Sequence, residues 1–283
     1  MHRFSVLRKS LRDQKWQIVG FGLALAVMAA LDLFIWPAYR DQLQNFELPP
    51  ALEGFLGGLS IATPEGFLTA EYFSWIPILL IVYAVIQGTG AIAGEESNGT
   101  IDLLLAQPIS RMLMVTERAA AVVIGSVLIV AVGCAGFAAT LPLVDIDISF
   151  TSIAIASVNM LPITLLFFAI SLWLGAVAPN RALASAVVIG LATAFYFINM
   201  LAGAVNVLER LNYATPFYYY GDGPPLAEGI VWWHAGLLLG IALLLFAATL
   251  RSFDARDVAT GGATDVSAST IWRRVLGVGE ARG

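Results

Sequence analysis

Six long apolar runs alternate with short polar segments along this chain of 283 residues. Each run is close to or above the roughly 20 residues that a helix needs to cross the hydrocarbon core of a membrane. The period-2 pattern of barrel strands is absent from the sequence. The pattern predicts an all-α polytopic membrane protein with six transmembrane helices, at about residues 16–36, 73–93, 119–141, 152–178, 182–207 and 229–250. Residues 1–250 would form a single transmembrane domain, followed by a polar tail at residues 251–283.

Composition strengthens this interpretation. Hydrophobic residues make up 59% of the chain, charged residues only 12%, and the mean hydropathy is +0.81. A soluble domain of this length could not bury so much apolar surface. Its single cysteine, Cys134, excludes an internal disulfide, and we expect no metal site because the two histidines, His2 and His234, are far apart. No basic stripe with interleaved aromatic residues is present, so we expect no nucleic-acid partner.

The charges of the connecting segments predict the orientation. With six spans, 13 of the 15 lysine and arginine residues fall on one side of the membrane, and only Arg40 and Arg210 fall on the other. The opposite side also holds ten acidic residues. Since cytoplasmic loops carry the excess of basic residues, both termini are predicted to be cytoplasmic, in a cell (inner or plasma) membrane. The basic side would also attract anionic lipid, which makes membrane lipid an expected partner.

Two segments outside the spans allow alternatives. Residues 1–15 place Phe4, Leu7 and Leu11 at helical spacing among basic residues, which predicts an amphipathic interface helix on the inner leaflet; a basic anchor that only fixes topology is the compatible alternative. In the larger outer loop, residues 37–72, the apolar piece at 51–60 is either an interfacial or re-entrant helix or a plain connection. Trp36 and Pro37 are interpreted as the outer end of the first span.

Polar residues inside the spans are the candidates for a substrate pathway. Asp32 is the one clear acid, and an ionisable residue in a span is a functional candidate by default. It lies four residues before Trp36, however, so we favour a carboxylate that reaches the interface. The uncharged candidates join helices more often than they line a path. The candidate pathway residues are Asp32, Asn159, Thr164, Thr193 and Asn199.

Aromatic residues gather in the second outer loop, residues 208–228. They suit the belt of aromatic side chains at the membrane surface, which we prefer to the alternative of a substrate-binding cluster. The residues concerned are Tyr213, Phe217, Tyr218, Tyr219 and Tyr220.

The segment from Gly94 to Arg118, between the second and third spans, contains more acidic, apolar and helix-breaking residues than a simple turn requires. Glu95 and Glu96 place two acids at the end of a span, where they need a partner. Thr100 can cap a new helix, which Pro108 would end because the residue before a proline disfavours the helical region. The segment therefore predicts a short surface helix, set so that a push on it moves both neighbouring spans.

This segment also resembles a family signature. Its pattern, with Gly94-Glu95-Glu96, Gly99-Thr100, Leu103-Leu104-Leu105 and Pro108-Ile109-Ser110-Arg111, is similar to that of type-2 ATP-binding-cassette (ABC) exporter permeases, close to the nitrous-oxide-reductase accessory permease-like branch. The segment 252–258, Ser-Phe-Asp-Ala-Arg-Asp-Val, resembles the ending that this branch has after its last span.

The resemblance implies a fold and a mechanism. Such permeases pair as homodimers or heterodimers above two separate ABC ATPase subunits, which bind ATP and Mg²⁺, so this chain itself would need no cofactor. ATP-driven closure of the ATPases would tilt the spans and cause efflux of substrate along the dimer seam. The segment 94–118 would hold the cytoplasmic coupling helix, and the turn at 179–181 a second, smaller contact. The coupling residues implied in this way are Glu95, Glu96, Gly99, Thr100, Leu104, Pro108, Ser110, Arg111, Asn180 and Arg181.

The residues that the chain lacks agree with a separate ATPase. Its two lysines, Lys9 and Lys15, do not follow a glycine-rich loop, so the phosphate cradle of P-loop ATPases is absent and no catalytic residues are expected. A seam of apolar and small residues favours a hydrophobic or amphipathic substrate. The alternatives are a self-sufficient secondary carrier, which would favour repeats and mid-span carboxylates, and a non-transporting membrane scaffold.

Overall fold

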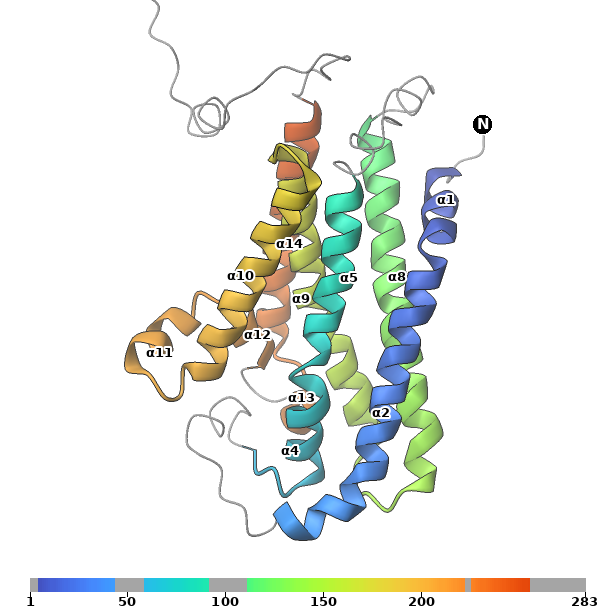
Figure 1. Cartoon of the computed structure of the whole chain (residues 1–283), viewed down its shortest axis with the longest axis vertical. Coiled ribbons are helices and arrows are strands. Elements are labelled where there is room, and N and C mark those ends of the chain that lie inside the picture. Colours follow the sequence, from blue (N-terminus) through green and yellow to red (C-terminus); the bar gives the residue numbers. More distant parts are fainter. Residues whose placement is uncertain (1–4, 44–58, 92–110, 222–224, 255–283) are drawn as a thin grey trace, which may run out of the picture.

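The computed structural model describes residues 5–43, 59–91, 111–221 and 225–254 (Figure 1). Those residues form helices and contain no strand. The elements are α1 (Ser5–Asp13), α2 (Lys15–Leu43), α4 (Pro64–Leu68), the π-helix η1 (Thr69–Phe73), α5 (Ile76–Ala91), α8 (Arg111–Thr140), the short 3₁₀-helix η2 (Leu141–Leu143), α9 (Phe150–Val177), α10 (Arg181–Leu201), α11 (Asn206–Asn212), α12 (Pro216–Gly221), α13 (Pro225–Glu228) and α14 (Trp232–Asp254).

Six helical stretches are long and apolar enough to cross a membrane, which confirms the all-α, six-span prediction. They are Lys15–Arg40, Pro64–Ala91, Met112–Leu143, Phe150–Val177, Arg181–Leu201 and Trp232–Ser252. Among the C-terminal ends of the spans, that of the fifth differs most from its prediction: the helix ends at Leu201 and not at residue 207. The chain then leaves the helical conformation, and Val205 is extended (φ −132°, ψ 108°) before α11 begins.

The first long helix does not end at Trp36 and Pro37. Helix α2 continues to Leu43 with Pro37 inside it. Trp36 is buried, 4% exposed, and its ring packs against Phe67 of α4 with centroids 5.2 Å apart. The tryptophan side chain therefore faces the bundle.

The second span is composite. Thr63 caps α4, its hydroxyl accepting the Gly66 N–H at 3.1 Å, and η1 follows directly. A turn at residues 74–75 then leads into α5, where Pro77 is the second residue. Proline is tolerated in the first turn of a helix because its missing N–H would have no partner there. The proline thus lies at a helix start, although it falls within a continuous apolar run of sequence.

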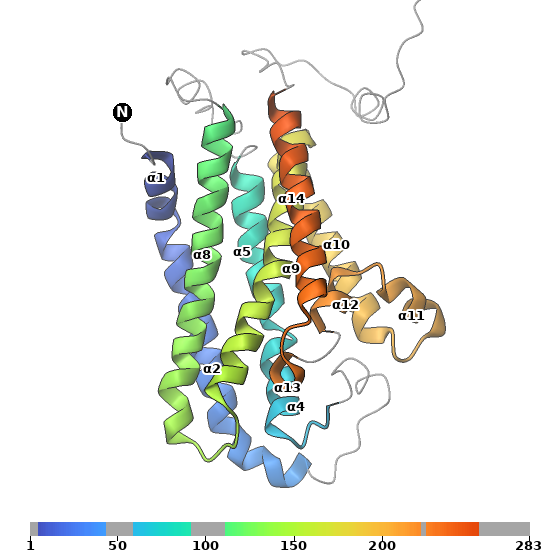
Figure 2. The same cartoon turned by 180° about the vertical axis from the view of Figure 1, so that it is seen from behind.

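Helix α9 lies at the centre of the bundle. It packs against α5 and α14, and α2 packs along α8 beside them (Figures 1 and 2). Glycines allow the closest approaches: a Cβ at Gly136 would lie 2.6 Å from the Cα of Ala26, and one at Gly88 would lie 2.5 Å from the Cβ of Ser171. In the most apolar stretch of each span, the share of buried residues is highest for α9 (67%) and lowest for α10 (17%). One side of α10 therefore lacks cover from the other described residues.

The connections divide between two ends of the bundle. Helix α1, the last turn of α5, the start of α8, the turn at 178–180 and the end of α14 gather at one end, which we call the α1 end (Figure 1). The start of α4 and the end of α8 lie at the opposite end, which we call the α4 end. The first and last described helices, α1 and α14, thus reach the same end of the bundle, as an even number of spans requires.

Candidate functional site

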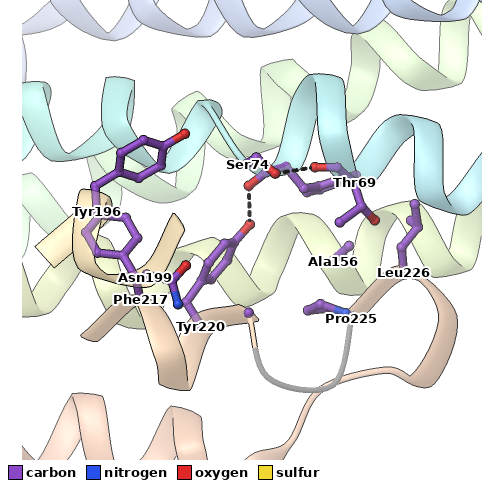
Figure 3. Close-up of a pocket in the computed structure, with 11 residues that line it drawn as sticks. Thr69, Ser74, Ala156, Tyr196, Asn199, Phe217, Tyr220, Pro225 and Leu226 are labelled. Atoms are coloured by element: carbon purple, nitrogen blue, oxygen red, sulfur yellow. Dashed lines mark hydrogen bonds between the residues drawn. The ribbon is translucent and has the colours of Figure 1, made fainter. Parts of the chain in front are cut away.

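Two groups of residues have the character of functional sites, one toward each end of the bundle. Toward the α4 end, a cavity of about 40 Å³ lies between η1, α9, α10, α12 and α13 (Figure 3). That volume holds only a few waters at roughly 10–15 Å³ each. A π-helix on its wall is notable because such segments occur often at functional sites.

Tyr220 of α12 fixes the wall of this pocket. Its hydroxyl donates to the backbone carbonyl of Phe73 at 2.8 Å, and its own carbonyl accepts a hydrogen bond from Asn159 Nδ2 at 3.1 Å (Figure 3 shows the first contact). Burial raises the pKa of Tyr220, so the phenol stays protonated and remains a donor. Tyr220 therefore joins three elements, α12, η1 and α9.

Asn199 of α10 lines the same pocket. Its Nδ2 donates to Asn212 Oδ1 at 3.0 Å, and Asn212 is held in turn by the Thr215 hydroxyl, which donates to the Asn212 carbonyl at 2.8 Å. Of the five candidate pathway residues, Asn199 therefore lines the pocket, and Asn159 holds the carbonyl of the lining residue Tyr220. Both are bonded to the segment between α10 and α14, which folds back into the bundle.

The other three candidates lie elsewhere. Thr164 is fully buried, and its hydroxyl donates to the carbonyl of Met160 in its own helix at 2.7 Å, so the contact is local to α9. Asp32 of α2 is 9% exposed, and its Oδ2 has no hydrogen-bond partner among the described residues. Asp32 interacts electrostatically with Glu71. Thr193 is exposed on α10.

Thr193 lines a separate, almost wholly apolar groove of about 330 Å³ between α5 and α10. Tyr196 and Phe217 line both this groove and the pocket at the α4 end. Their rings meet edge to face, with centroids 5.6 Å apart. The two aromatic side chains therefore separate the apolar groove from the smaller pocket.

Sequence reasoning missed Tyr196 and assigned Phe217 and Tyr220 to a surface belt. Tyr213 is 55% exposed, as a belt residue would be, but Phe217 and Tyr220 are 4% and 9% exposed. Their position after Pro216, which begins α12, was the available signal for a short helix. That signal does not reveal that the helix packs inside the bundle.

At the α1 end, two arginines bind the last two turns of α5. Arg118 of α8 donates to the carbonyl of Ala91, and Arg181 Nη2 donates to the carbonyl of Ile86 at 3.2 Å. Ser185 of α10 adds a hydrogen bond to the hydroxyl of Thr89 at 3.1 Å. The end of α5 is therefore tied to the starts of both α8 and α10.

The predicted coupling residues fall in different parts of this end. Asn180 caps α10, because its Oδ1 accepts the Leu183 N–H at 2.8 Å, and Arg181 is the first residue of that helix. Arg111 begins α8, and its side chain is not described. The remaining residues lie outside the described part of the chain: Glu95, Glu96, Gly99, Thr100, Leu104, Pro108 and Ser110.

Glu117 of α8 is a further residue that sequence reasoning did not single out. It is 9% exposed, and its Oε2 accepts the backbone N–H of Leu7 at 2.9 Å. A carboxylate at the start of a helix satisfies an N–H that has no partner within the helix and complements the helix dipole. Glu117 thus fastens α1 to the third span, next to Arg118.

The comparison with known families bears on both groups of residues. A family model described as "ABC-2 family transporter protein" matches residues 6–258. This chain belongs to the ABC-2 transporter family. A search of curated proteins finds no match. The family confirms the coarser part of the resemblance: the chain is a multi-pass permease subunit of an ABC transporter, and it associates with an ABC ATPase subunit.

Within this ABC-2 permease, neither group of residues has the composition of a catalytic centre. The described residues contain no group of three or more histidine, cysteine, aspartate or glutamate side chains that could hold a metal ion. The pocket at the α4 end offers amides, a phenol and aromatic rings, whereas the α1 end offers guanidinium groups on backbone carbonyls.

Proposed function

We propose that this permease is the transmembrane subunit of an exporter, moving a hydrophobic or amphipathic substrate outward with ATP and Mg²⁺ bound by a separate ATPase. The observation that carries the proposal is the family match over residues 6–258 in a sequence without a phosphate-binding loop. The motif from Gly94 to Arg111 supports a place near the nitrous-oxide-reductase accessory branch. Both termini, and with them the α1 end, would then be cytoplasmic.

Coupling would act through the α1 end. The segment expected to dock on the ATPase starts at Gly94, three residues after Ala91, and the second contact is the turn at 179–181. Since Arg118 and Arg181 hold carbonyls of the last two turns of α5, a push at either contact would move this end of the helix. The two contacts would therefore act on α5 together, with two ATPase copies per dimer.

The substrate route that we propose follows the apolar groove between α5 and α10 and ends at the pocket toward the α4 end. The groove walls are almost without polar atoms, which supports an apolar substrate. Tyr196 and Phe217 would have to separate for substrate to pass from groove to pocket. Asn199 would then meet it at the outer end, beside the Tyr220 carbonyl that Asn159 holds.

A second permease subunit would cover α10. Small residues recur at every fourth position on its exposed face, at Ala186, Gly190 and Ala194. Such a stripe allows close approach of another helix within a membrane. Either another copy of this chain or a related permease would fit there.

The proposal is tested first by affinity purification of the tagged chain from its native membrane in mild detergent, followed by mass spectrometry. We expect a stoichiometric ATPase that carries its own phosphate-binding loop. Recovery of the chain alone, in several detergents and in native nanodiscs, would instead favour a secondary carrier. The buried Asp32 Oδ2 without a hydrogen-bond partner is the observation that favours that second function.

Coupling is tested by two substitutions in the segment that docks. Glu96→Lys reverses one of the paired acids, and Leu104→Pro breaks the apolar face of the expected surface helix. We expect both variants to insert into the membrane and to lose substrate-dependent transport. Full transport by both would contradict the assignment of residues 94–118 as the coupling segment.

A further inference from the structure

A third cavity, of about 240 Å³, opens at the α1 end and is unlike the two already described. It lies between the start of α2, the last turn of α5 and the starts of α8 and α10. Its walls carry the guanidinium groups of Arg118 and Arg181 and the amides of three glutamines, Gln14, Gln17 and Gln87. Asp13 is the one acid among the residues that line it.

The hydrogen bonds of these side chains leave donors on the cavity wall. Gln14 Oε1 accepts the Tyr83 hydroxyl at 2.6 Å, and Gln17 Oε1 accepts from the amide of Gln87. The acceptor of each of these two glutamines is therefore used within the protein, and its amide nitrogen is the group that can donate. Arg181 gives one nitrogen to Ile86, while a guanidinium carries five N–H donors in all.

The cavity lies at the depth of lipid headgroups. Trp16, next to Gln17 in the chain, is 74% exposed, and Lys15 Nζ lies 5.3 Å from its ring centre. Tryptophan and lysine at the end of a span mark the boundary between hydrocarbon and headgroups. A polar cavity between spans at this level can be reached by a headgroup from the surrounding leaflet.

We propose that this cavity binds the phosphodiester of a membrane phospholipid. Basic pockets between spans at headgroup depth suit this ligand, because guanidinium groups match phosphate oxygens in both charge and geometry. Among the described residues that line the cavity, two guanidinium groups and the carboxylate of Asp13 leave a net charge of one positive unit. A phosphodiester carries one negative charge, whereas free phosphate and nucleotides carry more. The proposal does not depend on the direction or the substrate of transport.

The binding experiment uses the full-length protein, delipidated in detergent and titrated with phosphatidylglycerol under native mass spectrometry. We expect one tightly retained phosphatidylglycerol in the wild type and roughly tenfold weaker retention in Arg181→Gln, because a charge-assisted pair is lost. Arg251→Gln is the matched control, since Arg251 is exposed at the same end but lies outside the cavity. It should retain the lipid as the wild type does.

A second variant keeps the proposal testable if Arg181→Gln misfolds. Gln17→Leu removes an exposed donor from the cavity without changing a charge, and it should weaken retention. It also removes the exposed hydrogen bond from Gln87, so the melting temperature of the lipid-free protein should fall only slightly. Wild-type retention by both cavity variants overturns the proposal, as does an equal loss in Arg251→Gln. In a parallel titration, inorganic phosphate that stabilises the lipid-free protein as much as phosphatidylglycerol does would identify a free-anion site and overturn the lipid assignment.

Discussion

The two ends of this permease are held together by different chemistry. At the α1 end, charged side chains reach from one helix to the backbone of another, as Glu117 does to α1 and Arg181 to α5. At the α4 end, a buried phenol and aromatic rings do the same work, through Tyr220 and through the contact of Tyr196 with Phe217. The α1 end is thus held by charged side chains, and the α4 end by buried, uncharged ones.

This difference matches what each end would have to do in an exporter. The exposed guanidinium of Arg181 can exchange the Ile86 carbonyl for water at little net cost, because a hydrogen bond to water replaces the one that is lost. Buried hydrogen bonds and ring contacts are costly to break without replacement, at about 1–3 kcal/mol for each buried polar group left without a partner. The α1 end therefore suits repeated rearrangement by a partner, and the α4 end suits a seal that opens rarely.

The largest effect that we expect comes from pushing α5 away from α9. In Gly88→Ala the new Cβ would lie 2.5 Å from Ser171 Cβ and 2.9 Å from the Phe168 carbonyl oxygen, so the helices must separate. We expect a loss of about 2–3 kcal/mol in the free energy of unfolding, measured by denaturant titration in micelles. Gly20→Ala, inside α2, is the control, because nothing lies within 4 Å of its added Cβ.

The control should change stability in the opposite direction. Alanine is favoured over glycine inside a helix by about 1 kcal/mol, so Gly20→Ala should be neutral or slightly stabilising. Equal destabilisation by the two substitutions would show that the close α5–α9 contact at Gly88 is not the cause of the loss.

The spans themselves could be predicted from the sequence because hydropathy is a local property. Six apolar runs identified six spans, and the turn before α10 was expected from residues 178–182 alone. The composite second span could not be predicted, since nothing in the apolar run announces a π-helix at Thr69–Phe73. The early end of α10 was missed because residues 202–207 are as apolar as the helix that precedes them.

The candidate site was less predictable because its contacts join residues far apart in the chain. Asn159 and Asn199 could be singled out as polar residues inside apolar spans. Their surroundings could not, because Tyr220 contacts Phe73 across 147 residues. Glu117 likewise contacts Leu7, 110 residues away in the sequence, and this pairing depends on the packing of α1 against α8. Single-sequence patterns carry no information on such pairs.

An intermediate effect is expected from the phenol at the α4 end. Tyr220→Phe removes the hydroxyl that donates to the Phe73 carbonyl and leaves a buried acceptor without this donor, which should cost about 1–2 kcal/mol of unfolding free energy. Tyr219→Phe is the matched control, because its hydroxyl also donates to a backbone carbonyl, that of Tyr213, but at an exposed position. Thermal unfolding in nanodiscs would compare them, and a control as destabilised as Tyr220→Phe would contradict a special role for burial.

The smallest effect that we expect is a local one at the α1 end, where Glu117 holds α1. Glu117→Gln keeps an oxygen that can accept the Leu7 N–H but removes its charge, and neutral hydrogen bonds are about half as strong as charge-assisted ones. We expect a local loss of about 1 kcal/mol, seen as faster hydrogen exchange in α1 with little change in global unfolding. Exchange measured by mass spectrometry would test this against Glu228→Gln, an exposed acid on α13. If α1 exchanges no faster in Glu117→Gln than in the control, its apolar contacts with α8 suffice to hold it. The α1 end would then depend on packing as the α4 end does, and the contrast between the two ends would be one of composition only.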